Sequence, residues 1–382
     1  MIKNTTSHLW FQNFLSETEL QAILAEFNYT DTARKCTVST VISYLISAAT
    51  NEWKSLRHAA DTGPSAGLVS VDHSSLSKHM KALDYAIIKR VFEVIVGKLN
   101  RATRRTLKMP KTLLSIDSTT ITVGKTRLPW AVYHGERSGI KLHVSFANET
   151  AMPLQIVETT GLKHDGPIGV SLEDKRFILV CDRAYFSIDK VERYVTETEK
   201  QYFVIRLKDN VQLNRKKSLK GIRTKDSNVT ADFTCTIGTP QKQTEKRHRI
   251  VQFTDYEGRD IRVVTNVMNV AAEEIAAMYK SRWAIESFFR WIKQNLNVPV
   301  LFGTTSNAVF NQLFAAMIAY VLLKYLHVQG QSYKKINSKP LSFAGFTRLF
   351  LCNDLPIEWR INLNETLAFH RQLNQSELYN NG

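Results

Sequence analysis

Apolar residues recur at helical spacing through the first quarter of the chain. VISYLISAAT and YAIIKRVFEVIVGKL each place an apolar residue every three or four positions, which predicts two helices with a buried face. Between them, DTGPSAGLVSVD is rich in Gly, Pro and Ser and predicts a loop. We therefore expect residues 1–108 to form a helical domain.

The segment that ends this loop, VDHSSLSKHMKAL, predicts a short helix with a polar outer face. Asp72 or Ser74 can cap its start, and Leu76, Met80 and Leu83 fall on its inner side. Small polar and basic outer groups suit a helix that enters the major groove of DNA, although a solvent-facing helix of any bundle has a similar surface. The groups predicted to face outward are Ser75, Ser77, Lys78, His79 and Lys81.

The pattern changes near residue 109 from helical spacing to alternation. Residues 109–206 predict strands with one or two helices, which is the first part of an α/β core. The expected strands are 112–116, 119–123, 139–147, 153–159, 176–181 and 201–206, and the expected helix is 187–199.

From 207 to 261, many charges interrupt short β-like runs. This pattern predicts a β-rich, positively charged insertion that could grip DNA beside the core, and a solvated charged loop is the alternative. The candidates for phosphate contacts in this segment are Arg215, Lys216, Lys217, Lys246, Arg247, His248 and Arg249.

The remaining third of the chain favours helices. Residues 262–300 are expected to complete the core, and residues 301–382 to be helical with a disordered polar tail after about residue 375. The apolar run Leu313–Leu323 is too short to span a bilayer, so it predicts a buried core helix.

One stretch without Gly or Pro, AAEEIAAMYKSRWAIESFFRWIKQNL, predicts a single helix. At about 100° per residue, Arg282 and Glu286 lie on the same side as Tyr279. Lys293 follows two turns later, and Arg290 falls near the same stripe. A carboxylate flanked by cations suits a site where metal ions and phosphates meet. An ordinary surface ion pair of Glu286 is the simpler alternative.

Two isolated aspartates upstream are candidates for further carboxylates of this site. Asp117 follows the apolar run LLSI and Asp182 follows FILVC, so each comes at the end of a predicted buried strand. Such strand ends bind ligands in α/β sheets, although a lone Asp there is more often a turn residue or a helix cap. Asp165 is the nearest rival to Asp182, but its context, LKHDGP, predicts a turn.

The composition favours a polyanionic partner. Lys and Arg number 51 against 35 Asp and Glu, a net charge of +16, although a generally basic protein has the same balance. The four cysteines form no CxxC pair, which excludes a zinc module or a disulfide framework and suits a reducing compartment. The N-terminal segment lacks the apolar run and cleavage site of a signal peptide.

The spacing Tyr279-x2-Arg282-x3-Glu286-x6-Lys293 resembles the YREK signature of bacterial insertion-sequence transposases with a DDE catalytic domain. IDSTTI and CDRAYF resemble the family's first and second Asp blocks, GIKLHVSF the strand between them, and KHDG a short His-Asp segment. The resemblance runs from about Leu113 to Lys293, with a looser match in the N-terminal part. It implies an α/β, RNase H-like catalytic core interrupted by a β-rich insertion, with helical N-terminal and C-terminal regions.

Carried over position by position, the resemblance implies that Asp117, Asp182 and Glu286 form a catalytic triad. Asp-Asp-Glu supplies hard oxygen ligands for two Mg²⁺ ions, for which Mn²⁺ can substitute. The implied contacts to DNA phosphates are Tyr279, Arg282, Arg290 and Lys293. Three further residues of family-like blocks are expected to be structural: Trp130, His143 and His164.

The resemblance also implies a function and partners. We expect a transposase that binds the terminal inverted repeats of its element and target DNA as a homodimer, in the bacterial cytoplasm at the nucleoid and not at a membrane. Water attacks the phosphodiester at each end, and the freed 3′-hydroxyl attacks the opposite strand or target DNA. Two alternatives stay open: a catalytically silent, transposase-derived DNA-binding regulator, and a metal-dependent nuclease that cuts without joining.

Some relatives stack a flipped base on an aromatic residue of the insertion. This insertion contains no Trp, so Phe233, Phe253 and Tyr256 are the candidates, and the sequence does not choose among them.

Overall fold

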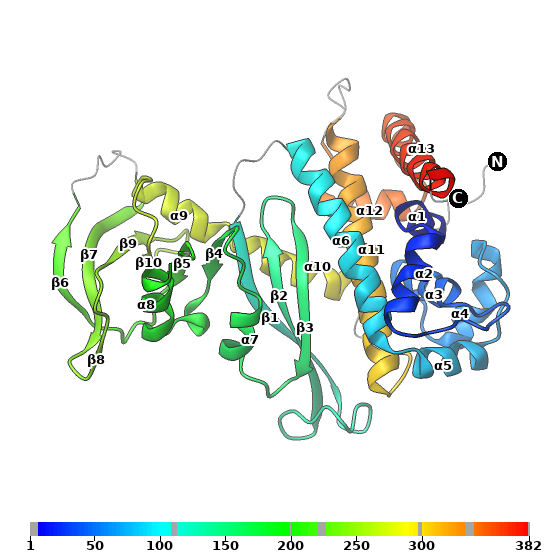
Figure 1. The fold of residues 1–382 in the computed structure, drawn as a ribbon, viewed down its shortest axis with the longest axis horizontal. Helices are drawn as coiled ribbons and strands as arrows, with labels where there is room; N and C mark the ends of the chain where they lie inside the picture. Colours follow the sequence, from blue (N-terminus) through cyan, green and yellow to red (C-terminus); the bar gives the residue numbers. More distant parts are fainter. Residues whose placement is uncertain are drawn as a thin grey trace. The chain divides into compact units, whose positions relative to one another are not determined.

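The described part of the chain divides into two compact units in the computed structural model (Figure 1). The helical unit combines Met1–Lys108, Thr122–Ser138 and Phe289–Gly382, and the sheet unit combines Met109–Ile121 and Gly139–Phe288. The five-part division expected from the sequence stays a prediction. The structure describes residues 7–107, 113–198, 200–219, 227–296, 300–332 and 340–380.

The helical unit begins with short helices whose starts are set by capping side chains. Ser16, Thr37, Ser55 and Asp72 each accept a backbone N–H of the first turn, which satisfies donors that have no partner inside a helix. The elements are α1 Ser7–Phe14, α2 Glu17–Glu26, α3 Val38–Thr50, α4 Leu56–Thr62, η1 Pro64–Ala66, α5 His73–Ala82, α6 Tyr85–Leu107, α11 Ser306–Ser332, α12 Phe343–Leu351 and α13 Ile357–Asn380.

The core of the helical unit is built around α11. Its segment Leu313–Leu323 is buried all round, so the prediction of a buried core helix is confirmed. The helix is long and apolar enough to cross a membrane, yet 94% of its most apolar window is buried inside the structure, as in the core helix of a globular protein. The tail predicted to be disordered after about residue 375 is instead helical as far as Asn380, because α13 continues through a run without Gly or Pro.

The described residues of the sheet unit form a ten-stranded mixed sheet in the order β3-β2-β1-β4-β5-β10-β9-β7-β6, with β8 beside β7. β1 pairs with β4 and β4 with β5 in parallel. The elements are β1 Leu113–Gly124, β2 Arg137–Ala147, β3 Met152–Thr160, α7 Asp165–Ser171, β4 Ile178–Cys181, η2 Arg183–Tyr185, α8 Ile188–Thr196, β5 Phe203–Arg206, β6 Leu213–Ser218, β7 Val229–Thr239, β8 Lys242–Gln243, β9 His248–Thr254, β10 Asp260–Thr265 and α9 Ala272–Lys280.

The central strands are buried on both faces, as is usual for parallel strands covered by helices. Leu179 and Cys181 of β4 pack with α8 and η2 in one apolar cluster. Ile178 and Val180, which alternate with them, pack with α9 in a second cluster. The strand is therefore apolar at every position, which is why the sequence shows FILVC as a continuous run.

Two expectations from the sequence differ from the structure in detail. The two strands expected on either side of Asp117 are one strand, β1, because β-branched residues continue through TTITV. LKHDGP is a turn only in its first part: α7 starts at Asp165, and Pro167 is tolerated because it lies in the first turn.

The described part of the charged segment 207–261 is rich in strands. Strands β6 to β9 extend the same sheet through β10 and β5. That this segment is an insertion that grips DNA stays a prediction.

Leu179→Ala is expected to lower the free energy of unfolding by about 2–5 kcal/mol, because the side chain is completely buried in the central strand and its removal leaves a cavity. Urea denaturation followed by circular dichroism measures this change. Val170→Ala, at an exposed position on α7, is the matched control and is expected to change stability by less than about 0.5 kcal/mol. Equal losses in the two variants would contradict the placement of Leu179 in the core.

Candidate active site

The pairing of β1 with β4 brings the two aspartates together. Ile116 lies opposite Cys181 in this parallel pair, so Asp117 and Asp182 each follow a paired residue on neighbouring strands, which are about 4.8 Å apart. Strand alternation points both side chains to the face that α9 covers, since Val180, two positions before Asp182, packs with α9. Asp182 precedes η2 but makes no side-chain cap to it, so the helix-cap alternative does not hold.

The predicted single catalytic helix is two helices. α9 ends at Lys280, α10 (Trp283–Asn295) follows, and Ser281 and Arg282 form a turn between them. Tighter i→i+3 hydrogen bonds run through this turn, including Arg282 N to Tyr279 O at 3.1 Å. The Ser281 hydroxyl donates to the Met278 carbonyl at 2.7 Å, which draws this carbonyl away from the regular helix.

At the turn between α9 and α10, the side chains of Tyr279 and Arg282 contact three carboxylates. Tyr279 donates its hydroxyl to Asp182 Oδ1 at 3.2 Å. Arg282 donates from Nη1 to Asp117 Oδ2 at 3.3 Å and from Nη2 to Glu286 Oε1 at 2.5 Å. The structure therefore gathers all five residues into one cluster within the sheet unit. The surface ion-pair alternative for Glu286 is only half right, because the pair exists but Arg282 is 8% exposed.

The charges in this cluster are partly buried and perturb one another. Burial raises the pKa of Asp117 to about 6, the Ser118 N–H and the Arg282 cation oppose this rise, and the neighbouring Asp182 and Glu286 charges add to it. Such mutual perturbation of carboxylates is typical of functional sites. Glu286 and Asp182 thus belong to the same electrostatic site as Asp117.

The residues fit a divalent cation in donor chemistry. Carboxylate oxygens are the ligands that Mg²⁺ prefers. Burial disfavours the Arg282 cation, yet its neighbours Tyr279 and Glu286 and the two aspartates hold its pKa above the ordinary value, so the cluster already stabilises a positive charge. Across the described ranges, no group of three His, Cys, Asp or Glu side chains is arranged to hold a metal. In this arrangement the Arg282 guanidinium lies between Asp117 and Glu286 and compensates their negative charge.

A second polar network lies behind Asp117. Ser118, the next residue of β1, points to the opposite face and donates to Asp165 Oδ1 at 2.7 Å. Lys141 Nζ and the buried His143 Nδ1 each lie 3.4 Å from the same oxygen. Asp165 is therefore not in the carboxylate cluster, and we regard this network as support for β1. The sequence offered a signal for it, since all of these residues fall in blocks that resemble the transposase family.

Most predicted DNA contacts are exposed in the structure. Three of them, Tyr279, Arg282 and Arg249, are buried. Arg249 pairs with Asp232 at 2.8 Å and donates to the carbonyls of Val267 and Val270, so it braces the sheet and does not face solvent. His248 is likewise buried and lies 3.3 Å from Glu192. Both belong to β9, so two of the four residues of the basic run 246–249 lie within a strand of the sheet. The exposed candidates are Lys78, Lys81, Arg215, Lys216, Lys217, Lys246, Arg247, Arg290 and Lys293.

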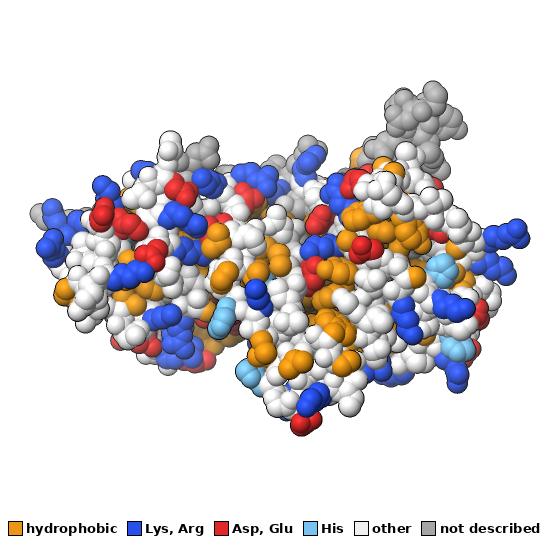
Figure 2. Space-filling model, turned by 60° about the horizontal axis from the view of Figure 1, so that its bottom comes forward, with side chains coloured by type: hydrophobic (Ala, Val, Ile, Leu, Met, Phe, Trp, Pro, Cys, Tyr) orange, Lys and Arg blue, Asp and Glu red, His pale blue; other side chains and the backbone are white. Residues whose placement is uncertain are grey.

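On the face drawn in Figure 2, Lys and Arg side chains are spread out with Asp and Glu among them. This face therefore shows no single band of basic residues.

The predicted recognition helix is α5. Asp72 caps it by accepting from the N–H groups of Ser74 and Ser75 at 2.9 and 3.0 Å. Leu76 and Met80 are buried, and the lysines of the same helix are exposed. α4 precedes it in the helical unit, and the connection between the two contains the short helix η1.

The structure separates the three insertion aromatics. Phe233 and Phe253 are buried in the sheet core, while Tyr256, in the β9–β10 turn, is 70% exposed. Its ring lies 6.2 Å from that of Trp283, which is 40% exposed at the start of α10. Trp283 is adjacent to Arg282, so the exposed aromatic pair borders the carboxylate cluster.

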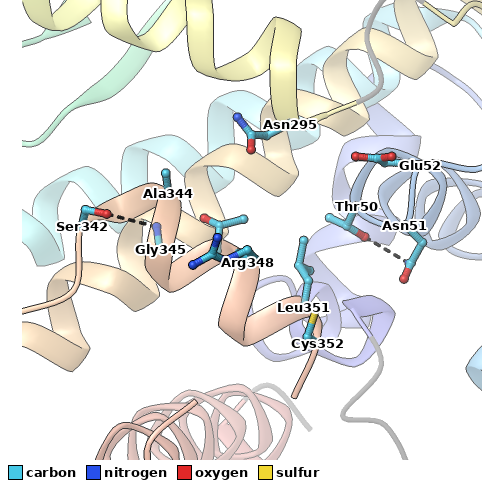
Figure 3. Close-up of a pocket in the computed structure, with 11 residues that line it drawn as sticks. Thr50, Asn51, Glu52, Asn295, Ser342, Ala344, Gly345, Arg348, Leu351 and Cys352 are labelled. Atoms are coloured by element: carbon cyan, nitrogen blue, oxygen red, sulfur yellow. Dashed lines mark hydrogen bonds between the residues drawn. The ribbon is translucent and has the colours of Figure 1, made fainter. Parts of the chain in front are cut away.

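One hollow of about 750 Å³ lies in the helical unit, between the end of α3 and α12. Figure 3 shows Arg348 pointing into it, with Asn295 and Glu52 at its rim. The described residues that line it include none of the predicted catalytic residues. A smaller hollow of about 470 Å³ borders Asp182 and is lined by Arg183 and Lys208. Of the two hollows, the smaller is the one that touches a predicted catalytic residue.

Comparison with known proteins gives consistent relatives. The family model for the transposase DDE domain matches residues 108–322. The probable transposase for insertion sequence element IS5377 of Geobacillus stearothermophilus is 50% identical over 382 residues, which is 100% of both chains. The transposase named for insertion sequence element IS4SA of Synechocystis is 26% identical over 76% of this chain and 81% of its own. A piggyBac transposase synaptic complex with hairpin DNA covers 97% of this chain and 86% of its own, with 11% identity and a TM-score of 0.49.

Asp117→Asn is expected to stabilise the metal-free protein at pH 7.5 and to have little effect near pH 4. Burial raises the pKa of Asp117 from 3.8 to about 6 in the folded protein. Between these values the folded state binds more protons than the unfolded state, so stability falls as the pH rises, by at most about 3 kcal/mol. Asn cannot ionise, so the variant lacks this loss. Urea denaturation in EDTA across this pH range measures it.

Asp61→Asn, at an exposed position on α4, is the control and should follow the wild type at every pH. If Asp117→Asn also follows the wild type at every pH, the raised pKa of Asp117 is wrong.

Proposed function

This chain belongs to the family of transposases with a DDE domain, and from that premise we propose that it cleaves and joins DNA at the ends of an insertion sequence with Asp117, Asp182 and Glu286 as its catalytic triad. The observation that carries the proposal is the cluster in which Tyr279 and Arg282 link all three carboxylates.

DDE transposase domains generally use divalent metals, and the three carboxylates are the groups that would hold them here. A bound pair of Mg²⁺ ions supplies activation of the attacking oxygen and stabilisation of the leaving oxygen. Mn²⁺ suits the same ligands.

The proposed reaction is two phosphoryl transfers without a covalent protein–DNA intermediate. In the first, a water oxygen bonds to the phosphorus at the end of the element and the 3′-oxygen leaves as a hydroxyl. In the second, that 3′-hydroxyl bonds to a phosphorus of the opposite strand or of target DNA, and the 3′-oxygen of the attacked strand leaves. Tyr279, Arg282 and Lys293 position the phosphates, with Arg290 beside them, because guanidinium and ammonium groups neutralise and orient phosphate oxygens.

We propose an RNase H-like core formed by β1 to β5, which lie in the order β3-β2-β1-β4-β5. The strands from β6 to β9 form the β-rich insertion between the second Asp and the Glu. Their exposed cations, among them Lys216 and Lys217, are proposed to contact phosphates. Arg247 is exposed too, but its guanidinium donates to Thr234 and to the Arg215 carbonyl. Arg249 is withdrawn from this role, because it is buried and paired.

Recognition of the terminal repeats is assigned to α5, whose exposed Lys78 and Lys81 lie opposite a buried face. A helix with an exposed basic face of this kind can enter the major groove. Because an element has two ends, we propose a homodimer on DNA, acting in the cytoplasm where bacterial DNA lies. Nothing in the proposed chemistry needs a membrane.

Among the insertion aromatics, Tyr256 is the one we propose to stack on an unpaired base. It is exposed, it borders the cluster, and Trp283 gives it a second ring. Aromatic stacking accepts any base, since every base has a π-face.

Glu286→Gln is expected to abolish cleavage, by at least about 100-fold, because it removes one proposed metal ligand charge. DNA binding is expected to stay within about twofold. The measurement is nicking and strand transfer on DNA with the element's terminal repeats, in Mg²⁺ and in EDTA. Glu197→Gln removes a partly buried carboxylate that pairs with Arg193 four positions away, as Glu286 pairs with Arg282. It is the matched control and should cut as the wild type does.

The alternatives give different outcomes in the same assay. A wild-type protein that binds the ends but never cuts with any divalent metal would be the regulator. One that cuts but does not transfer pre-cut ends would be the nuclease. If Glu286→Gln cuts as well as the wild type, the triad assignment is wrong.

Tyr256→Ala is expected to make the unstacked state of the terminal base less favourable, because it removes an aromatic surface on which that base stacks, worth about 1–3 kcal/mol. A 2-aminopurine at the terminal position reports the unstacked base by its fluorescence. The fraction of unstacked base should fall about tenfold in Tyr256→Ala. Tyr256→Phe should keep the signal, and Tyr202→Ala, at an exposed tyrosine before β5, should leave it unchanged. An unchanged signal in Tyr256→Ala would remove this role.

A further inference from the structure

Arg282 is directed at the carboxylates of the cluster. Both terminal nitrogens donate to them, Nη1 to Asp117 and Nη2 to Glu286. Its Nε is buried and finds no hydrogen-bond partner among the described residues, and its side chain is 10% exposed. As it lies, the guanidinium therefore presents little of its surface to a DNA phosphate.

We propose that Arg282 exchanges partners between the carboxylates and the DNA phosphate, and that this exchange couples metal binding to DNA binding. The inference rests on the proposed triad and adds a role that a plain phosphate contact does not have. In the absence of DNA, Arg282 is the counter-ion of Asp117 and Glu286. With DNA in place, Arg282 turns to the phosphate and leaves the two carboxylates to a divalent cation.

The charge balance of the cluster favours such an exchange. Three carboxylates share a partly buried site, in which the side chains of Asp117 and Glu286 are 24% and 33% exposed, and like charges at close range repel. Removal of the cation between Asp117 and Glu286, with nothing in its place, would leave this repulsion uncompensated. Arg282 is therefore expected to leave more readily when another cation arrives.

The fork of the guanidinium explains why one residue can serve both partners. Its planar donors span two carboxylates from different elements, β1 and α10, and the same geometry matches the oxygens of a phosphate. The carbon of the Arg282 guanidinium lies over the Tyr279 ring, 5.7 Å from its centroid. This cation–π contact can be kept while the guanidinium changes its hydrogen-bond partners. A lysine at this position could reach one carboxylate but could not bridge two.

The exchange makes metal and DNA affinities reciprocal. If a phosphate draws Arg282 away from the carboxylates, it removes the competitor of the metal, and linkage then requires that metal binding strengthens DNA binding by the same factor. The protein away from its DNA ends would hold metal weakly. This would restrict cleavage to assembled complexes.

The test is Mn²⁺ affinity, measured by electron paramagnetic resonance without DNA and with a pre-cut duplex that ends at the element boundary and has no bond left to cleave. Wild type is expected to bind Mn²⁺ about tenfold more tightly with the duplex. Arg282→Gln is expected to bind Mn²⁺ about tenfold more tightly than wild type without DNA, and to gain nothing further when the duplex is added.

Two variants keep the result interpretable. Arg176→Gln breaks an exposed Arg–carboxylate pair with Asp174 just before β4, at the end of that strand remote from Asp182, and should behave as wild type. Arg282→Lys keeps a cation and should retain part of the DNA effect, so it covers the case in which Arg282→Gln does not fold by circular dichroism.

Each outcome decides between the exchange and the triad. Equal Mn²⁺ affinity of wild type with and without the duplex, or equal affinity of wild type and Arg282→Gln, overturns the exchange and leaves the triad standing. Glu286→Gln should bind Mn²⁺ poorly in every state. If it binds as wild type does, the triad fails and the exchange fails with it.

Discussion

The site depends on the parallel register of β1 and β4. The pairing of Ile116 with Cys181 brings Asp117 and Asp182 onto adjacent strands and the same face, and it does so with apolar neighbours on both sides of the sheet. A shift of one residue would turn either carboxylate to the opposite face. Carboxylates forced together in this way repel, so the same register that builds the site creates the need for a cation.

The break between α9 and α10 answers that need. An unbroken helix would carry Tyr279, Arg282 and Glu286 past the strands along one line. The turn at Ser281 lets α9 pack on the sheet while α10 takes its own direction, and Arg282, at the junction, reaches both Asp117 and Glu286. Asn148, which donates to the Ser281 hydroxyl at 2.8 Å, ties this turn to the segment after β2.

The sequence predicted the parts of this molecule that local pattern determines. β4 and the buried segment of α11 follow from apolar runs, and α5 from its capping residue and spacing. The helix break was missed because its hydrogen bonds involve Asn148, 133 positions away in the chain. The burial of Arg249 was missed because its partner, Asp232, belongs to another strand of the sheet. The choice of Tyr256 over Phe233 and Phe253 also needed the fold, since the three rings differ in burial and not in kind.

A site that must hold repelling charges makes the protein less stable at neutral pH, and the remainder of the sheet has to offset that loss. The raised pKa of Asp117 is the sign of this cost, and the two apolar clusters on either side of β4 supply the stability that permits it. Arg282 lowers this cost by pairing with Asp117 and Glu286, whereas an apolar residue in its place would leave the carboxylates unpaired. In the proposed exchange, the same bonds are the ones that DNA and metal replace, so the buried cation would serve the stability of the free protein and the chemistry of the complex.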